Sequence, residues 1–346
     1  MERAVYRIID ANFNRAREAI RIIEEFCRFA LNSSSLTERA KQLRHELSAA
    51  IDKLDSSKLI SSRDTLGDVG IGKTVDNQLQ RNNLHSCFTA GCKRLTEALR
   101  ALAETIQTIN PSVAKTIENL RYASYTLEKD IVLFFDTTEK FKRVKLYVII
   151  STGLPADVFS LAGRCVAGGA DCIQLRAKGI EDDQLFALAA EFVQLCKNGG
   201  VVSMINDRVD IAVAAGADGV HVGQNDLPLE QVRKLQLSPL IMGKSTHSVE
   251  QLRAAIGQQS TYVSLGPVFA TGTKPGAKPV GLEYVREATD ILANTGIGHV
   301  AIGGITPDNV GEVLRAGAKS IAVCSAVTEA KDPAAVCRTL KKEICV

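Results

Sequence analysis

The chain has 346 residues, of which 45% are hydrophobic and 23% are charged, and it carries a formal net charge of +3. This composition is ordinary for a globular protein of about two domains, and so small a net charge gives no electrostatic reason to expect nucleic acid or a membrane as a partner. No apolar run approaches the roughly 20 residues that span a bilayer, and nine scattered cysteines without a Cys-x-x-Cys pair favour reduced thiols in the cytoplasm over a disulfide framework or a zinc site.

Residues 1–135 carry apolar side chains at the spacing of helices. Three stripes recur every three or four positions, along 16–30, 95–109 and 113–131. Such spacing places the side chains on one face of a helix. The pattern predicts an all-α domain of four or five helices, with a long loop over residues 61–77.

A string within that loop, from Gly67 to Thr74, fits the phosphate-binding loop pattern of nucleotide-binding proteins. A true loop of this kind follows a buried strand and opens an apolar helix. Here Ser-Ser-Arg-Asp-Thr-Leu precedes Gly67 and Val-Asp-Asn-Gln-Leu-Gln follows Thr74. The context therefore favours an ordinary loop over a nucleotide site.

Residues 136–145 are polar and predict a linker, beyond which the pattern changes to short apolar runs separated by helical stretches. This alternation predicts a parallel sheet, and eight repeats predict a closed (β/α)8 barrel over residues 146–346, with an open doubly wound sheet as the alternative. The eight runs lie at 146–150, 172–175, 201–205, 219–222, 240–242, 262–265, 299–302 and 320–323.

In such a barrel, the residues that follow the strands form one rim, where ligands bind. The second strand brings the amide of Gln174 and the cations of Arg176 and Lys178 to this rim. Two cations and an amide suit a polyanionic ligand such as a pyrophosphate. The alternative is a solvated strand end with ordinary surface charges.

Two aspartates, Asp207 and Asp226, follow the third and fourth strands. Paired carboxylates together with a ligand phosphate suit Mg²⁺, which prefers hard oxygen ligands and keeps some of its waters. The alternative is that each aspartate caps the helix that follows it.

A second anion site is predicted where the seventh and eighth strands end, at Gly303-Gly304 and at Cys324-Ser325. Backbone N–H groups at this place in a barrel hold a phosphate monoester, whereas the alternative is a tight turn that needs glycine. The loop at 271–274 suits a lid over phosphates, with a mobile surface loop as the alternative. His221 lies within a strand pattern and is interpreted as a wall residue with satisfied hydrogen bonds, so no catalytic acid or base emerges.

Taken together, these motifs resemble the thiamine-phosphate synthase family over about residues 145–343. The matching strings are Gln-Leu-Arg-x-Lys at 174–178, Ile-Asn-Asp at 205–207, Ala-Asp-Gly-Val-His-Val-Gly-Gln-x-Asp at 217–226, Ser245 with His247, Gly-Pro-Val-Phe at 266–269, Thr-x-Thr-Lys at 271–274 and Ile-Gly-Gly-Ile at 302–305. Two positions depart from the family pattern, Ala177 where an acidic residue is frequent and Lys244 where a small one is. These departures bear on the fine geometry of the site rather than on activity.

The resemblance implies a transferase of thiamine biosynthesis that condenses an aminopyrimidine pyrophosphate with a thiazole phosphate. Mg²⁺ would be held by Asp207 and Asp226, and Arg176, Lys178 and Lys274 would stabilise the leaving pyrophosphate. The residues implied for the pyrimidine pyrophosphate are Gln174, Leu175, Arg176, Ala177, Lys178, Asn206, Ser245 and Lys274. Those implied for the thiazole phosphate are Thr271, Gly272, Thr273, Gly304, Cys324 and Ser325.

The alternative reading is an isomerase of a related barrel family that acts on the thiazole phosphate alone. Such an enzyme would not need the pyrophosphate and Mg²⁺ residues, so their joint presence favours the transferase. The N-terminal half resembles a helical extension of some bacterial synthases, on the strings at 8–12 and 63–70. The expected partners are small phosphorylated molecules, and the sequence leaves open whether the chain forms a homo-oligomer.

Overall fold

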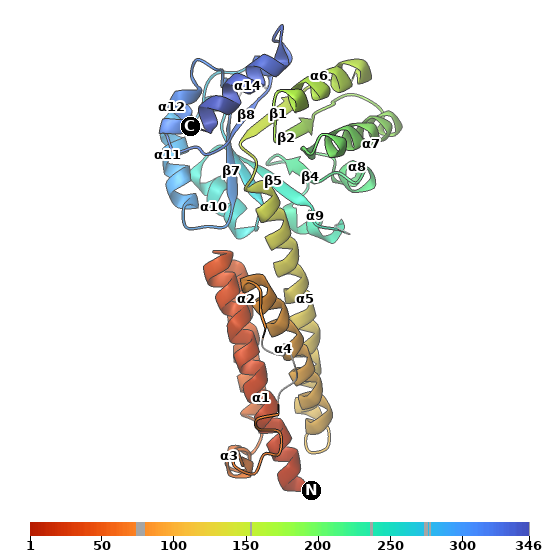
Figure 1. Ribbon diagram of the computed structural model, residues 1–346, viewed down its shortest axis with the longest axis vertical. Coiled ribbons are helices and arrows are strands. Elements are labelled where there is room, and N and C mark those ends of the chain that lie inside the picture. The colour runs from red at the N-terminus through yellow and green to blue at the C-terminus, as the bar shows by residue number, and fades with distance from the viewer. Residues whose placement is uncertain (74–79, 153, 236–237, 273–275, 277, 346) are drawn as a thin grey trace. The chain divides into compact units, whose positions relative to one another are not determined.

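The computed structural model describes residues 1–346 except 74–79, 153, 236–237, 273–275, 277 and 346. It divides into two compact units, residues 1–132 and residues 133–346 (Figure 1). The first unit is helical, and the second contains a closed sheet with its surrounding helices.

The first unit is built from helices that begin at capping residues. Ser33 precedes α2 and its Oγ accepts from the backbone N–H of Leu36, while Asn83 and Ser86 form a reciprocal capping box at the start of α4. Such caps satisfy N–H groups that the first helical turn leaves without partners. The helices are α1 (Glu2–Glu25), the π-helical turn η1 (Phe26–Ala30), α2 (Ser34–Ile51), α3 (Ser56–Ser62), α4 (Leu84–Ile106) and α5 (Pro111–Phe141), which continues into the second unit.

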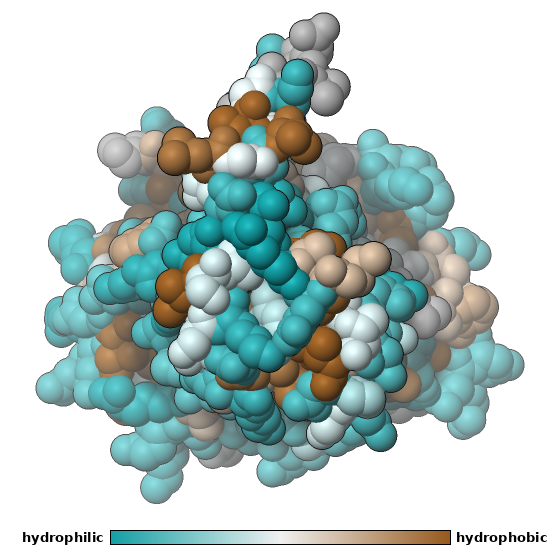
Figure 2. Space-filling view, turned by 90° about the horizontal axis from the view of Figure 1, so that it is seen from below, coloured by the Kyte–Doolittle hydropathy of each residue, from teal (hydrophilic) through white to brown (hydrophobic). Residues whose placement is uncertain are grey.

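The long loop expected after the second helix contains a short helix, α3, before its turns begin. Because α3 precedes Gly67, the buried strand that a nucleotide-binding loop needs is not there. Leu66, Val69 and Ile71 are exposed in this segment. Figure 2 shows that the face seen from below is mostly hydrophilic, with apolar residues in separate patches. No helix among the described residues is both long and apolar enough to cross a bilayer.

The segment 136–145, which we expected to be a linker, is helical as far as Phe141 and belongs to the second unit. Phe141 and Val144 are buried in the barrel, and the ring of Phe141 stacks on that of Tyr262 with centroids 4.0 Å apart. A β-carbon at Gly298 would lie 2.7 Å from the Phe141 ring, so the missing side chain there makes room for it. Sparse apolar residues in a polar run therefore close one end of the barrel.

The eight strands pair in parallel and in sequence order, and β8 closes on β1. The predicted barrel is confirmed, and the open sheet is excluded. The strands are β1 (Leu146–Ile150), β2 (Cys172–Leu175), β3 (Val202–Asn206), β4 (Gly219–Val222), β5 (Ile241–Thr246), β6 (Tyr262–Leu265), β7 (Gly298–Ile302) and β8 (Ile321–Val323). The helices around them are α6 (Pro155–Ala167), α7 (Asp182–Asn198), α8 (Val209–Ala214), α9 (Leu229–Leu235), α10 (Val249–Gly257), α11 (Gly281–Leu292), α12 (Val310–Arg315), α13 (Ser325–Thr328) and α14 (Pro333–Ile344).

Alternation along the strands separates two cores. Val148, Ile173 and Leu175 point outward and pack in the large apolar core shared with the helices. Tyr147 and Tyr262 point inward, into the cluster that also contains Phe141. Because successive side chains of a strand face opposite ways, the residues between the outward ones are the ones that reach the barrel interior.

Candidate active site at the carboxyl end of the barrel

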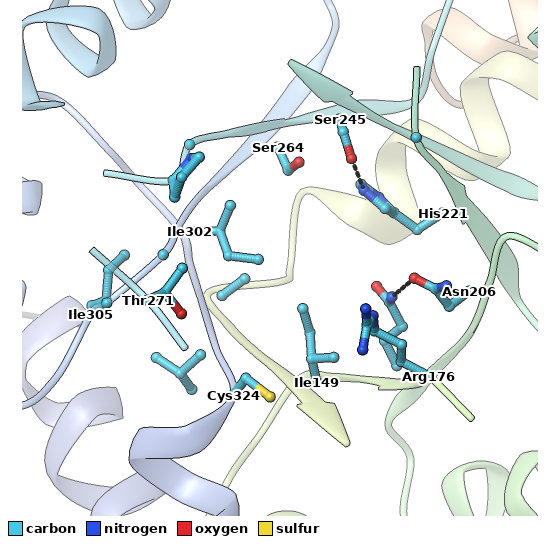
Figure 3. Close-up of a pocket in the computed structure, with 18 of the residues that line it drawn as sticks. Ile149, Arg176, Asn206, His221, Ser245, Ser264, Thr271, Ile302, Ile305 and Cys324 are labelled. Carbon is cyan, nitrogen blue, oxygen red and sulfur yellow. Dashed lines mark hydrogen bonds between the residues drawn. The ribbon is translucent and has the colours of Figure 1, made fainter. Parts of the chain in front are cut away.

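A cavity of about 390 Å³ lies at the carboxyl end of the strands. Residues from both sides of it, such as Arg176 and Asn206 on one side and Thr271 and Cys324 on the other, face the same space (Figure 3). The residues predicted for ligand or metal that line this cavity are Gln174, Arg176, Lys178, Asn206, Asp207, Asp226, Ser245, Thr271, Gly304, Cys324 and Ser325.

Three of the predicted residues do not line it. Leu175 is buried in the outer apolar core, and Ala177 packs against that core, because the alternation of β2 aims Gln174 and Arg176 inward and their neighbours outward. Gly272 is not among the lining residues either. Thr273 and Lys274 lie outside the described residues.

The cationic side chains at the end of β2 are held by neighbouring strand ends. Arg176 Nη1 donates to Ser151 Oγ, just after β1, at 2.7 Å. Lys178 Nζ lies 3.2 Å from Asp207 Oδ2, at the end of β3. These contacts hold two positive charges at the cavity wall while more than half of the Lys178 side chain stays exposed.

The carboxylates of Asp207 and Asp226 face each other across the ends of β3 and β4. Burial and the neighbouring Asp226 carboxylate raise the pKa of Asp207, against the opposing effect of Lys178. Asp207 has a φ of +60°, in the left-handed region, and its N–H donates to the His221 carbonyl at 2.8 Å. Strained backbone of this kind is most frequent at functional sites. A cation would relieve the repulsion that helps to raise the pKa of Asp207.

The helix-cap alternative does not describe Asp207. The residue at the N-cap of α8 is Arg208, and no side-chain hydrogen bond caps that helix. Asp226 instead accepts from the N–H of Gly223 within its own loop, at 2.6 Å. Both carboxylates line the cavity.

The donor set around this pair fits Mg²⁺ rather than a metal enclosed by protein ligands. No group of three or more His, Cys, Asp or Glu side chains that could hold a metal occurs among the described residues. Mg²⁺ is commonly bound through one or two carboxylates, with water and substrate phosphates completing its shell. Asp207 and Asp226 provide such a pair of hard oxygen ligands at the edge of a solvent-accessible cavity.

Lys244, noted in the sequence only as a departure from the family pattern, supports the loop that carries Asp226. Its side chain is buried inside β5, and its Nζ donates to the Gly223 carbonyl at 2.7 Å. Burial lowers the pKa of its ammonium group. Lys244 thus binds the carbonyl of Gly223 and Asp226 binds its N–H, and together they fix the loop that carries Asp226. The available signal was the departure noted at this position, a lysine where the family pattern has a small residue.

The opposite side of the cavity is built from close backbone contacts. Gly303 and Gly304 have φ values of +105° and +65°, and a β-carbon on Gly304 would lie 2.5 Å from the Ala270 carbonyl oxygen. Val268 and Phe269 donate to the carbonyls of Ile302 and Gly303, so the loop after β6 is tied to the end of β7. Glycine is therefore required at 304 by both conformation and space.

His221 has the satisfied hydrogen bonds that its strand pattern predicted. Its Nδ1 lies 2.8 Å from Tyr262 Oη. Its Nε2 lies 3.0 Å from Ser245 Oγ, a bond that Figure 3 shows as a dashed line. It also lines the cavity.

Comparison with known proteins gives two family matches along the chain. The thiamine monophosphate synthase family matches residues 146–327, and the ThiD2 family matches residues 7–130. The thiamine-phosphate synthase of Synechocystis sp. is 38% identical over 330 residues, 95% of this chain and 93% of that protein. That of Rhodopirellula baltica is 38% identical over 332 residues, 94% of this chain and 88% of the relative.

A solved structure resembles the barrel. The thiamine phosphate pyrophosphorylase from Pyrococcus furiosus superposes with a TM-score of 0.53 at 33% identity, over 58% of this chain and 95% of that one. The relatives thus cover both units, and the solved structure resembles a part of the chain close to the barrel in size.

Proposed function

The chain belongs to the thiamine monophosphate synthase family, and on that premise we propose that its cavity holds two phosphorylated substrates on opposite sides. The activity is the synthesis of thiamine phosphate, a transferase reaction of thiamine biosynthesis. The proposed substrates are an aminopyrimidine pyrophosphate and a thiazole phosphate. The observation that carries the division is the placement of cations and paired carboxylates on one side and glycine-bounded backbone on the other.

The pyrimidine pyrophosphate is assigned to the side formed by β2 to β5. Arg176 and Lys178 offer charge-assisted hydrogen bonds to phosphate oxygens. Gln174, Asn206 and Ser245 lie deeper and offer polar groups to a heteroaromatic ring. The charges lie near the rim and the amides lie inward, so a ligand with an anionic tail and a polar ring fits this side.

Asp207 and Asp226 are proposed to hold Mg²⁺ next to that pyrophosphate. The support is the raised pKa of Asp207 and the position of both carboxylates at the cavity wall. When bound, Mg²⁺ would supply positive charge to the pyrophosphate oxygens. Lys178, paired with Asp207 in the structure, would then be available to the anion.

The thiazole phosphate is assigned to the opposite side, formed by the ends of β6 to β8. Backbone N–H groups at Gly304 and around Cys324 and Ser325 suit a phosphate monoester at this place in a barrel. Thr271 lines the same side in Figure 3. The thiazole, which supplies the nucleophile, and the pyrimidine pyrophosphate, which carries the leaving group, are thereby bound at different strand ends.

The chemistry proposed for this site is stabilisation of a departing pyrophosphate. Arg176 and Lys178 take up negative charge as the C–O bond to the pyrimidine methylene breaks. The electron-rich aminopyrimidine tolerates the resulting carbocation, and the thiazole nitrogen captures it. No side chain has to remove a proton for these steps. Lys274 is assigned the same charge-stabilising role by family resemblance.

The isomerase alternative is not favoured. A barrel that acts on the thiazole phosphate alone has no use for Arg176, Lys178 and the Asp207–Asp226 pair, which here line one continuous cavity with the monoester side. Curated relatives that cover nearly the whole chain bear the synthase name.

We also propose that the enzyme works in the cytoplasm. None of the nine cysteines, all of which the structure describes, forms a disulfide. Small phosphorylated substrates are the proposed partners.

The function is tested with the purified full chain, both substrates and Mg²⁺. Thiamine phosphate is measured by oxidation to its fluorescent thiochrome, and pyrophosphate release is measured in parallel. We expect equimolar appearance of both products, dependent on both substrates. Absence of thiamine phosphate while the thiazole phosphate is isomerised would instead support the alternative.

A further inference from the structure

Six side chains inside the barrel, one from each of the strands β1 to β6, form a continuous chain of hydrogen bonds. Its members, in the order of contact, are Ser245, His221, Tyr262, Tyr147, Gln174 and Asn206. The successive distances are 3.0, 2.8, 3.0, 2.6 and 2.7 Å. Ser245 and Asn206, the two ends, both line the substrate cavity. The chain therefore leaves the cavity, passes through the core and returns to it.

The two tyrosines in the middle do not reach the ligand. Tyr147 is 1% exposed and Tyr262 is fully buried, and neither lines the cavity. Burial raises the pKa of both phenols well above the ordinary value, so each keeps its hydrogen at neutral pH. Each hydroxyl then has one hydrogen to donate, which makes the direction of the chain a matter of counting.

The direction follows from the Gln174 end. Tyr147 Oη donates to Gln174 Oε1, and Gln174 Nε2 donates to Asn206 Oδ1. Since the single hydrogen of Tyr147 is used, Tyr147 must accept from Tyr262. The hydrogen of Tyr262 is then used as well, so Tyr262 accepts from His221, whose Nδ1 carries the hydrogen. In the neutral imidazole, Nε2 then accepts from Ser245.

We propose that Tyr147 and Tyr262 are positioning residues that set the hydrogen-bond polarity of the substrate site from within the barrel core. With this polarity, Ser245 keeps lone pairs for the cavity and Asn206 turns its amide N–H groups toward it. A ring that carries an amino donor beside a ring-nitrogen acceptor matches such a pair. That identification of the ligand rests on the proposed function, whereas the polarity of the chain does not.

The packing around Tyr262 fixes the chain in place. The Tyr262 ring stacks on the ring of Phe141. A β-carbon on Gly243 would lie 2.4 Å from the Tyr262 hydroxyl and 2.5 Å from His221 Nδ1. The missing side chain of Gly243 therefore leaves the space in which the hydroxyl meets His221. A removed hydroxyl leaves its two partners in place but without their link.

The first test reads the tautomer of His221 by ¹⁵N NMR of histidine-labelled full-length protein, without substrate. We expect the Nδ1–H tautomer in the wild type. In Tyr147→Phe the Tyr262 hydroxyl loses its acceptor and turns to donate to His221 Nδ1, so the signal should change to the Nε2–H tautomer. Tyr147 does not touch His221, so a local packing defect would not produce this change. A wild-type Nε2–H tautomer, or an unchanged tautomer in Tyr147→Phe, would overturn the proposal.

The second test measures steady-state kinetics in Tyr147→Phe and Tyr262→Phe. We expect the KM for the pyrimidine pyrophosphate to rise about fivefold or more, as for a lost hydrogen bond, while the KM for the thiazole phosphate stays unchanged. Tyr284→Phe is the matched control, because the Tyr284 hydroxyl is also buried and donates a hydrogen bond, to Thr246 Oγ1 at 2.8 Å, but is not one of the six side chains of the hydrogen-bond chain. Equal effects on both substrates, or the same split in the control, would count against the proposal.

The two tests separate this proposal from the proposed function. If no variant and no wild type makes thiamine phosphate, the function fails while the NMR result still decides the polarity. If the wild type is active but the tautomer test fails, the positioning role is lost and the synthase assignment stands. Should Tyr147→Phe be insoluble, the wild-type tautomer still decides the polarity, and Tyr262→Phe still gives the kinetic comparison; should Tyr262→Phe be insoluble, Tyr147→Phe carries both measurements.

Discussion

Lys178 Nζ lies 3.2 Å from Oδ2 of Asp207, so a cation from the end of β2 neutralises a carboxylate from the end of β3. Both residues line the cavity. Lys178 is proposed to bind the pyrophosphate directly, and Asp207 is proposed to bind it through Mg²⁺. The ion pair joins the proposed metal site to the proposed pyrophosphate site. A bound Mg²⁺ and a bound pyrophosphate would each take one member of this pair.

Asp207→Asn and Asp226→Asn should each lower turnover by at least about tenfold, with partial recovery at high Mg²⁺, because two carboxylates share the ion. The measurement is the synthesis rate over a Mg²⁺ titration. Asp210→Asn is the control, since Asp210 pairs with Arg208 on the surface and does not line the cavity. Wild-type rates in both cavity variants would show that Mg²⁺ is not held there.

The Mg²⁺ requirement should depend on pH through Asp207. Burial, and then the Asp226 carboxylate, raise its pKa, so protons compete with Mg²⁺ at a pH where an ordinary aspartate is ionised. As pH falls, more of the carboxyl is protonated, and the Mg²⁺ concentration for half-maximal rate should begin to rise at a pH above the ordinary pKa of an aspartate. The same titration in Asp207→Asn should be flatter. A half-saturating concentration independent of pH in the wild type would contradict this.

Arg176→Ala should weaken use of the pyrimidine pyrophosphate more than that of the thiazole phosphate. Ser325→Ala should do the reverse, because the two residues follow different strands, β8 and β2, and are assigned to different phosphates. The measurement is the KM of each substrate at saturating concentrations of the other. Variants that raise both KM values equally would contradict the proposal that the two substrates bind on different sides of the cavity.

Gly243→Ala should destabilise the barrel by about 1–3 kcal/mol, because the added methyl meets the Tyr262 ring at 2.3 Å. Gly163→Ala in α6 is the matched control, since a β-carbon there meets nothing within 4 Å and alanine favours a helix. Free energies of unfolding from denaturant titration distinguish the two. Equal stability of both variants would show that the barrel interior relaxes around Gly243.

A fragment of residues 133–346 should fold and make thiamine phosphate, because every described site residue and Phe141 belong to it. A fragment that starts at 146 lacks Phe141 and Val144 and should lose about 3 kcal/mol or more of stability, as for deletion of a buried phenylalanine. Thermal unfolding and the synthesis rate of both fragments are compared with Phe141→Ala in the full chain. Equal stability of the two fragments would mean that the end of α5 is dispensable.

The sequence predicted the barrel well because its outer core is apolar and regular. The runs at 146–150, 172–175, 219–222 and 262–265 coincide with β1, β2, β4 and β6. By contrast, the run at 240–242 covers only the start of β5, which extends to Thr246. Lys244, Ser245 and Thr246 are polar, as loop residues are, but here each has a place in the strand. Ser245 lines the cavity, Lys244 donates to the Gly223 carbonyl, and Thr246 accepts from Tyr284 of α11.

Contacts between distant residues explain what the sequence could not show. Tyr147 and Tyr262 are 115 positions apart, and neither has a local motif that reveals a hydroxyl pair. In the sequence, Phe141 is an isolated apolar residue in a polar segment, and only the fold brings it to its partner ring, Tyr262 at the start of β6. The strand-end aspartates and cations were visible because the barrel rule places all strand ends on one rim.

The hydrogen-bonded interior also has a consequence for how the barrel assembles. If β1, β2, β4 or β6, which carry the four inner members of the hydrogen-bond chain, paired one residue out of step, the polar member of that strand would turn outward into the apolar layer. The neighbours on both sides would then be buried without partners, which costs free energy at three places at once. The polar groups in the core thereby make barrels with a shifted strand register less stable than the correctly aligned one.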